Sequence, residues 1–343
     1  MKRIYGVFLG ICLLCLVGCN SENEETVIKQ TKKEEQLQIG MCFDSFVIER
    51  WQRDRDVFVS TAQELGAQVD VQNANGDYNK QKEQIQYFID QEVDVLVIIP
   101  TNAEKISDII KEAKKEGIKI VSYDRLLTNG DADLYISFDN EEVGRLMAEA
   151  LAEKLHNGAN IVMLCGPQVD SNVGYIQKGF EEVVQESKMN IKDTIYVEGW
   201  KPELAYQYMS SNYRKLNHVD AVMCGNDSVA SQIVKYLAEK RMAGEIQVVG
   251  QDAELEACQR IVEGTQLMTV YKNVDELASL AAKYAVALAK NEEIEVSDTI
   301  NDGIYEIPYV ALTPIAVNID NMDEVIIDSG FHLKEDVYLN VNP

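Results

Sequence analysis

The sequence has few of the residues that metal sites and enzyme active sites use most. Its 343 residues include three histidines, and beyond residue 19 it has no Cys-x-x-Cys pair. A zinc or iron site of such ligands therefore has no support in the sequence. Gly-x-Gly-x-x-Gly, the Walker phosphate loop and the Gly-x-Ser-x-Gly turn of serine hydrolases are also absent. We expect neither a metal nor another cofactor.

Positive charge is also scarce. Lysine and arginine number 32 against 57 aspartates and glutamates, which gives a net charge of −25. Such a chain repels the phosphates of nucleic acids, so we expect no nucleic-acid partner. Four cysteines beyond residue 19 are widely spaced, and Cys42, Cys165 and Cys224 lie in apolar runs where a cysteine is usually a small buried hydrophobe.

Residues 1–18 have the layout of a signal peptide. Lys2 and Arg3 precede an uncharged run over residues 4–17, which is short for a membrane span. Gly18 precedes Cys19, as in signal sequences that are cleaved before a cysteine that then carries lipid. A plain secretory signal with an incidental cysteine is the alternative. We expect lipid on Cys19, a disordered tether over 19–36, and anchoring to the outer face of the cell membrane.

From residue 37 onward, apolar runs alternate with helical patterns. Val93–Ile99 is almost unbroken in its apolar character, which is typical of a parallel strand covered on both faces. Residues 219–223 repeat the pattern of residues 93–97 in the second half of the chain. This alternation predicts an α/β protein with two doubly wound, Rossmann-like parallel sheets.

The last third of the chain predicts a return to the first domain. A helix over 274–289 and a strand over 305–310 follow the second half, and Leu312–Val317 then recrosses. We expect one domain of 37–139 plus 273–312 and another of 140–272 plus 313–343. Three crossings between them would form a hinge.

Polar side chains gather where the predicted strands end, which is where open α/β sheets bind ligands. They are charged or amide residues with one tryptophan: Asp44, Arg50, Asp124, Arg125, Asp139, Asn140, Trp200, Asn226, Asp227, Asp252 and Lys272. Carboxylates accept from sugar hydroxyls, cations and amides donate back, and an indole covers a sugar's apolar face. The set therefore suits a neutral polyol.

Plainer interpretations of these residues remain open. The residues that directly precede helices could be only helix caps, namely Asp139, Asn226, Asp227 and Asp252. Trp51 and Trp200 could be core residues, and Arg50 could lie on a solvated helix face.

An enzyme is the competing class of function. Asp124, Asp139 and Asp252 could supply the two carboxyl groups of glycoside hydrolysis. Each has a cationic or amide neighbour that favours its ionised form, and the chain lacks the eightfold repeat of a barrel hydrolase. We therefore expect a protein that is not an enzyme.

From Leu37 onward the chain resembles the periplasmic sugar-binding proteins of the ribose, galactose and xylose type, and most closely the D-xylose-binding members that serve ABC importers. The segments that carry the resemblance are residues 49–52, 93–100, 123–125, 135–140, 250–253, 268–272 and 312–315. It implies two domains joined by three crossovers, which close on a sugar.

The resemblance also implies a set of sugar-binding residues. They are Arg50, Trp51, Asp124, Arg125, Asp139, Asn140, Trp200, Asn226, Asp252 and Lys272, with the two tryptophans stacking on the sugar and Asp139 supporting the site near the hinge. Ser45 and Gly225 depart from the family's usual Asp and Ser. D-xylose is the implied sugar, with other pentoses and glucose left open. The implied partner is an ABC permease or the ectodomain of a sensor histidine kinase.

Overall fold

The computed structural model describes residues 36–212 and 218–341. The predicted signal peptide, the lipidation site Cys19 and nearly all of the predicted tether lie outside these residues. Within the described part, no helix is both long and apolar enough to cross a membrane. Cys42, Cys165, Cys224 and Cys258 are buried free thiols, and burial of the first three agrees with the apolar runs in which they lie.

Seven strands form the first sheet, in the order β11-β12-β5-β4-β3-β1-β2. All neighbours are parallel except the β11–β12 pair. The strands are β1 (Leu37–Phe43), β2 (Ala67–Asn73), β3 (Val95–Ile98), β4 (Lys119–Tyr123), β5 (Leu134–Phe138), β11 (Asp298–Asn301) and β12 (Glu306–Leu312). The return of the chain to this sheet is thus confirmed by β12, which pairs with β5.

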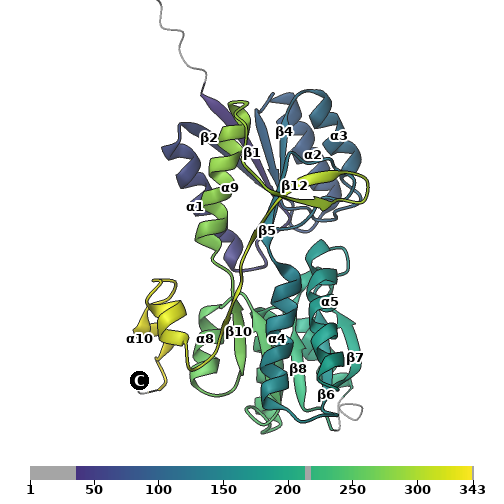
Figure 1. Ribbon diagram of the computed structural model, residues 1–343, viewed down its shortest axis with the longest axis vertical. Helices are drawn as coiled ribbons and strands as arrows, with labels where there is room; N and C mark the ends of the chain where they lie inside the picture. The colour runs from purple at the N-terminus through teal and green to yellow at the C-terminus, as the bar shows by residue number, and fades with distance from the viewer. Residues whose placement is uncertain (1–35, 213–217, 342–343) are drawn as a thin grey trace, which may run out of the picture. The chain divides into compact units, whose positions relative to one another are not determined.

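Helices cover both faces of the first sheet (Figure 1). Helices α1 (Arg50–Glu64) and α9 (Val274–Ala289) pack together on one face, and α2 (Tyr78–Asp90) and α3 (Ser107–Lys115) on the other. The strand β3 reads Val-Leu-Val-Ile and is fully buried, because side chains on both of its faces meet a helix layer. We call this sheet with its helices the first lobe.

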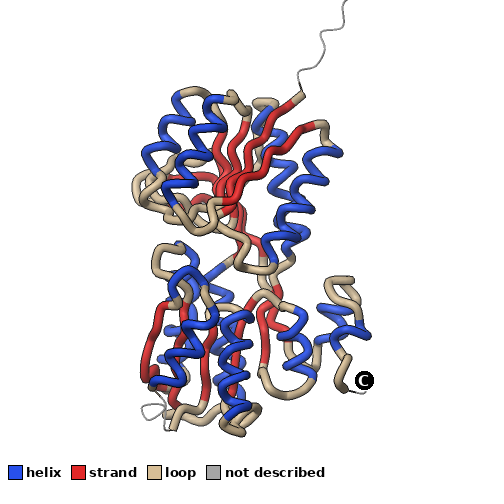
Figure 2. The backbone as a smooth tube through the Cα atoms, turned by 180° about the vertical axis from the view of Figure 1, so that it is seen from behind, coloured by secondary structure: helices blue, strands red, loops and turns tan. Residues whose placement is uncertain are grey.

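Six strands form the second sheet, in the order β13-β10-β9-β8-β6-β7. They are β6 (Asn160–Cys165), β7 (Asn190–Tyr196), β8 (Ala221–Cys224), β9 (Gln247–Gln251), β10 (Met268–Tyr271) and the antiparallel edge strand β13 (Ile315–Val317). Its helices are α4 (Asn140–Lys154), α5 (Ser171–Glu186), α6 (Pro202–Ser211), α7 (Asp227–Glu239) and α8 (Leu255–Val262). Figure 2 shows helices on both faces of its strands. We call this sheet with its helices the second lobe.

The chain passes between the two sheets three times. The passages join β5 to α4, β10 to α9, and β12 to β13. Two doubly wound α/β lobes with three crossings are therefore confirmed, while the exact domain limits remain a prediction. Beyond β13, a π-helical turn (Asp323–Ile327) and α10 (Lys334–Val337) pack on the second lobe beside α8.

Glycines let α4 and α5 approach closely. A side chain at Gly179 of α5 would overlap the backbone of Glu141, and one at Gly144 of α4 would overlap Ile176. By contrast, Gly174 lies on the same helix as Gly179 with nothing within 4 Å of the Cβ position.

We expect Gly179→Ala to lower the free energy of unfolding by about 2 kcal/mol or more, because the two helices must separate to admit the methyl group. Gly174→Ala is the matched control, and we expect it to leave stability unchanged or raise it by about 0.5–1 kcal/mol. Urea unfolding of both variants checks this. Equal stability of the two would contradict the close approach.

Candidate functional site

The structure gathers residues from both lobes into one small pocket. Nine of the ten residues predicted to bind sugar line it: Arg50, Trp51, Asp124, Arg125, Asn140, Trp200, Asn226, Asp252 and Lys272. Five further lining residues were missed by the sequence analysis: Ile48, Asp170, Asn172, Ile176 and Gln251. The carboxyl ends of strands from the two sheets supply most of these positions, as expected for this type of fold.

The tenth predicted residue, Asp139, lies elsewhere. It is exposed, and its carboxylate caps α4 by accepting from the backbone N–H of Glu142 at 3.0 Å. Asp139 borders a separate hollow with Tyr135 and Tyr309 at the passage between the lobes. The helix-cap interpretation therefore describes its contacts, and the structure does not place it in the pocket.

Arg50 and Asp124 form the centre of the first lobe's contribution. Their charged groups lie 2.8 Å apart, and Asp54, one turn along α1, also binds Arg50 at 3.0 Å. The Arg50 guanidinium lies 4.5 Å from the Trp51 ring centroid. Burial alone would lower the pKa of Arg50, but Asp124 and Asp54 raise it well above its usual value. Arg50 is therefore a permanent cation in the pocket.

Asp124 stays ionised although it is buried. Burial raises its pKa, but Arg50, Lys272 and Arg125 together lower it below the usual value. Its backbone has a φ of +61°, and its carbonyl accepts from Ser137 Oγ at 2.6 Å. A non-glycine residue persists in this left-handed conformation only where its surroundings hold it, as at functional sites.

Arg125 joins the two lobes. It pairs with Asp44 of the first lobe at 2.6 Å and with Asp170 of the second lobe at 2.7 Å. Asn172, two residues after Asp170, donates from Nδ2 to Asp124 Oδ2 at 3.0 Å. Asp170 and Asn172 thus bring the start of α5 against the end of β4.

Asp252 and Lys272 are the second lobe's ion pair, with their charged atoms 2.7 Å apart. Asp252 follows β9 with a φ of +97°, and Lys272 follows β10. Asn226 accepts from the backbone N–H of Val229 and so caps α7, while it also lines the pocket. For Asn226, capping and pocket lining therefore coexist.

Trp200 is held in place by its neighbours. Its Nε1 donates to Asp170 Oδ2 at 3.0 Å. A side chain at Gly166 would overlap its ring, and one at Gly225 would begin 3.1 Å from the ring and 2.9 Å from the Gly166 nitrogen. Glycine at 225 therefore makes room for the indole.

The pocket's charges balance, and some of its polar atoms lack partners. Among the lining residues, three cations (Arg50, Arg125, Lys272) face three carboxylates (Asp124, Asp170, Asp252), while Asp54 and Asp44 pair with two of these cations from outside the lining. Several buried polar atoms that line it have no hydrogen-bond partner within residues 36–212 and 218–341, among them Trp51 Nε1, Arg125 Nη2, Asn226 Nδ2 and Gln251 Oε1. Buried polar groups are normally satisfied, so these atoms point to a neutral ligand rich in hydroxyl groups.

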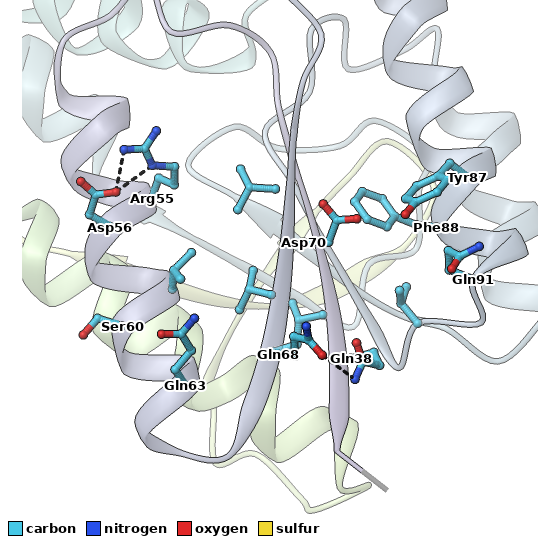
Figure 3. Close-up of a pocket in the computed structure, with 15 residues that line it drawn as sticks. Gln38, Arg55, Asp56, Ser60, Gln63, Gln68, Asp70, Tyr87, Phe88 and Gln91 are labelled. Atoms are coloured by element: carbon cyan, nitrogen blue, oxygen red, sulfur yellow. Dashed lines mark hydrogen bonds and ion pairs between the residues drawn. The ribbon is translucent and has the colours of Figure 1, made fainter.

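A larger hollow lies away from this pocket. It has a volume of about 880 Å³ and follows the outer edge of the first sheet, between α1 and α2 on either side of β2 (Figure 3). Asp70 and Gln68 of β2 line it, together with Arg55 and Tyr87 from the two helices. None of the predicted site residues is among its lining residues. In the described part of the chain, no group of three or more His, Cys, Asp or Glu residues could hold a metal.

Two carboxyl groups lie buried behind Asp252. Asp227 accepts from Thr269 Oγ1 at 2.6 Å and from the backbone N–H of Glu254 at 3.2 Å, while Glu254 accepts from Ser228 Oγ. Burial raises the pKa of both carboxyl groups, and for Glu254 the charge of Asp227 adds to the rise. The folded protein thus keeps these protons at pH values where the unfolded chain has released them.

We therefore expect the free energy of unfolding to fall between about pH 5 and about pH 8, because unfolding then releases protons and a rise in pH favours it. Glu254→Gln should flatten this fall by about 1 kcal/mol or more, since it removes one of the two groups. Glu256→Gln is the control, because the Glu256 side chain is 75% exposed on the same helix. Urea unfolding across the pH range measures the effect, and identical slopes in wild type and Glu254→Gln would contradict it.

Comparisons with known proteins agree with this geometry. The model of the family described as "Periplasmic binding protein domain" matches residues 39–293. The D-xylose-binding periplasmic protein of Haemophilus influenzae is 42% identical over 95% of this chain and 98% of its own length. The protein of the same name from Escherichia coli K12 is 41% identical over 88% of this chain and 93% of its own.

A solved structure gives the same result for the fold. The carbohydrate transporter solute-binding protein of Chloroflexus aurantiacus, in complex with D-glucose, matches with a TM-score of 0.80 at 26% identity. The match covers 88% of this chain and 97% of that one. These relatives are named as binding proteins and not as enzymes, so the prediction of a protein that is not an enzyme is confirmed. The chain belongs to the family of periplasmic binding proteins.

Proposed function

We propose that this protein binds a monosaccharide, D-xylose, in the pocket between its two lobes. The observation that carries the proposal is the set of buried polar atoms without partners beside a balanced set of charges. A neutral sugar offers hydroxyl groups that both donate and accept, so it can satisfy such atoms without adding charge. A phosphorylated or carboxylated ligand would upset the balance of three cations and three carboxylates.

The apolar parts of the pocket suit the same ligand. Trp51 and Trp200 enter from different lobes, and each is more than nine-tenths buried. A pyranose ring has faces of C–H groups that pack well against indole rings. Around it, Asp124 and Asp252 accept hydroxyl protons, while Arg125, Asn226 and Lys272 donate to the sugar oxygens.

Closure of the lobes is the proposed mechanism. The pairs Arg125–Asp170 and Asn172–Asp124 cross from one lobe to the other and exist only when the lobes are together. A sugar that contacts both lobes favours that arrangement by its differential binding. The relatives named for D-xylose binding support this sugar, and the solute-binding neighbours support delivery of the closed form to the permease of an ABC importer.

The setting of the protein is part of the proposal. Relatives named as periplasmic support an extracytoplasmic location. The order of Lys2, Arg3, an uncharged run and Gly18-Cys19 supports a lipid anchor on Cys19. Recognition of the closed form by the ectodomain of a sensor histidine kinase remains the alternative to import.

We expect Asp252→Asn to weaken D-xylose binding by about 100-fold, which corresponds to about 2.7 kcal/mol, because a neutral amide oxygen accepts a hydroxyl proton more weakly than a carboxylate and Lys272 loses its counter-charge. Isothermal titration calorimetry with D-xylose, D-glucose, D-ribose and L-arabinose measures this. Asparagine tolerates the left-handed backbone at 252, so the fold is kept.

Asp70→Asn is the matched control for this experiment. Asp70 lines the hollow at the edge of β2 and not the pocket, so its variant should bind like the wild type. Heat from none of the four sugars with the wild-type protein would refute the sugar proposal. Equal weakening by both substitutions would refute the placement of the site.

A separate prediction concerns the anchor. Cys19→Ala should move the protein from the membrane fraction to the soluble fraction of cells or their medium, because the acceptor thiol for lipid is gone. Fractionation followed by immunoblotting measures this. Membrane retention equal to that of the wild type would contradict lipid anchoring at Cys19.

A further inference from the structure

The C-terminal segment reaches the back of the pocket. Residues 319–341 lie past residue 293, where the match to the family model ends. Within this segment, Phe331 and His332 pack against Ala253 and Tyr271, which directly follow and precede the paired residues Asp252 and Lys272. Neither Phe331 nor His332 lines the pocket itself.

His332 holds the backbone next to Asp252. Its Nε2 lies 2.8 Å from the Ala253 carbonyl oxygen, and because a carbonyl only accepts, Nε2 is the donor. Asp252 and Ala253 are consecutive residues with positive φ, +97° and +51°. The Ala253 N–H donates to Thr269 Oγ1 at 3.1 Å. The Ala253 carbonyl accepts from the Cys258 thiol at 3.6 Å as well, so His332 supplies the shorter of two bonds to the carbonyl of this strained residue.

Phe331 supports the other member of the pair. Its ring meets the Tyr271 ring edge-on, with 4.9 Å between the centroids. Tyr271 is the last residue of β10 and is 6% exposed, and Lys272 follows it. The rings of Phe331 and Tyr271 thus fix the point from which the lysine side chain extends into the pocket.

The same segment also touches the first lobe. Arg53 lies on α1, one turn beyond Arg50, and its Nη1 donates to the Phe331 carbonyl at 3.2 Å. The Arg53 guanidinium lies 4.6 Å from the centroid of the Phe331 ring. Two bonds of 2.6 Å to Asp275, in the first turn of α9, hold the guanidinium in place.

We propose that Phe331 and His332 are positioning residues, which hold the Asp252–Lys272 pair in its binding geometry and fasten the second lobe to α1 of the first through Arg53. This inference rests on the proposed function, since the pair is a sugar contact there. Loss of the contact lowers the population of the binding-competent arrangement, and apparent affinity falls in proportion to that population.

Affinity for D-xylose and the separation of the lobes test this proposal together. We expect Phe331→Ala to weaken binding by about tenfold. Phe331→Tyr, which keeps the ring, should bind within about twofold of the wild type. His332→Leu keeps the volume but removes the donor, and we expect a loss similar to that of Phe331→Ala. Leu333→Ala is the control, because Leu333 is the next residue and is 60% exposed.

Small-angle scattering of the sugar-free protein supplies a readout that is independent of sugar. Phe331→Ala should have a larger radius of gyration than the wild type and Leu333→Ala, since the ring that packs against the Arg53 guanidinium is gone and only the bond to the backbone carbonyl of residue 331 is left to join the lobes. If the role of these residues is merely structural, the substitutions lower the melting temperature. The affinity for D-xylose, measured well below that temperature, and the radius of gyration then stay unchanged. That result would overturn the proposal.

The outcomes also separate this inference from the proposed function. If the wild type binds no sugar, the proposed function fails, and the radius of gyration alone decides whether the segment joins the lobes. If the wild type binds D-xylose but Phe331→Ala and His332→Leu bind equally well, the function stands and the inference fails. If Phe331→Ala does not fold, His332→Leu and Arg53→Lys test the inference in its place. Arg53→Lys is informative because a single ammonium group cannot bind Asp275 and the Phe331 carbonyl together as the guanidinium does.

Discussion

The pairing of buried charge across the two lobes is the constraint on which this structure depends. Arg125 is 3% exposed, and it is neutralised by one carboxylate from each lobe, Asp44 and Asp170. A buried guanidinium that loses such partners is costly, so the lobes are driven to meet where these groups can pair. The same rule sets the chemistry of the pocket. The cations of the pocket are already paired with carboxylates. A ligand therefore has to supply hydrogen bonds and no charge.

Residues that do not line the pocket also hold its lining residues in place. Asp124, Trp200 and Asp252 all have positive φ, so the backbone at three lining positions is strained. Specific neighbours hold each of them: Ser137 and Tyr135 bind the Asp124 carbonyl, and Asp170 binds the Trp200 indole. Lys272 pairs with the Asp252 carboxylate. Most of these contacts come from residues of the two lobes that the family model covers. The C-terminal segment adds a hydrogen bond to the Ala253 carbonyl, next to the second lobe's ion pair, from outside the region that the family model covers.

Sequence reasoning predicted the residues that directly follow strands. Asp124, Arg125, Asp252 and Lys272 come at most two residues after β4, β9 and β10, and the carboxyl ends of parallel strands meet at one edge. Asp170 and Asn172 were missed because they do not directly follow a strand. They lie beyond the loop after β6, where Asp170 is the N-cap of α5 and Asn172 is its second residue. Polar residues at such positions usually indicate only the start of a helix. Asp139 also directly follows β5, but its side chain caps α4, so a support of the site by Asp139 near the hinge stays a prediction.

The fold shows the same limits. The alternation of strands and helices predicted the two sheets because buried parallel strands are strongly apolar. The strand β11 (Asp298–Asn301) was not predicted, since its residues are polar and mostly exposed and its partner β12 determines it. The contact of Arg125 with the second lobe is made with Asp170, 45 positions along the chain. The local sequence pattern does not encode a contact over such a separation.

The central claim is that one neutral sugar satisfies the unpartnered polar atoms between the lobes. A crystal structure of the protein grown with saturating D-xylose tests it most directly. Our account predicts a xylose ring against Trp51 and Trp200, with hydroxyl oxygens within hydrogen-bonding distance of Arg125, Asn226 and Asp252. An empty pocket under these conditions, or a sugar bound at any other place on the lobes, would contradict it.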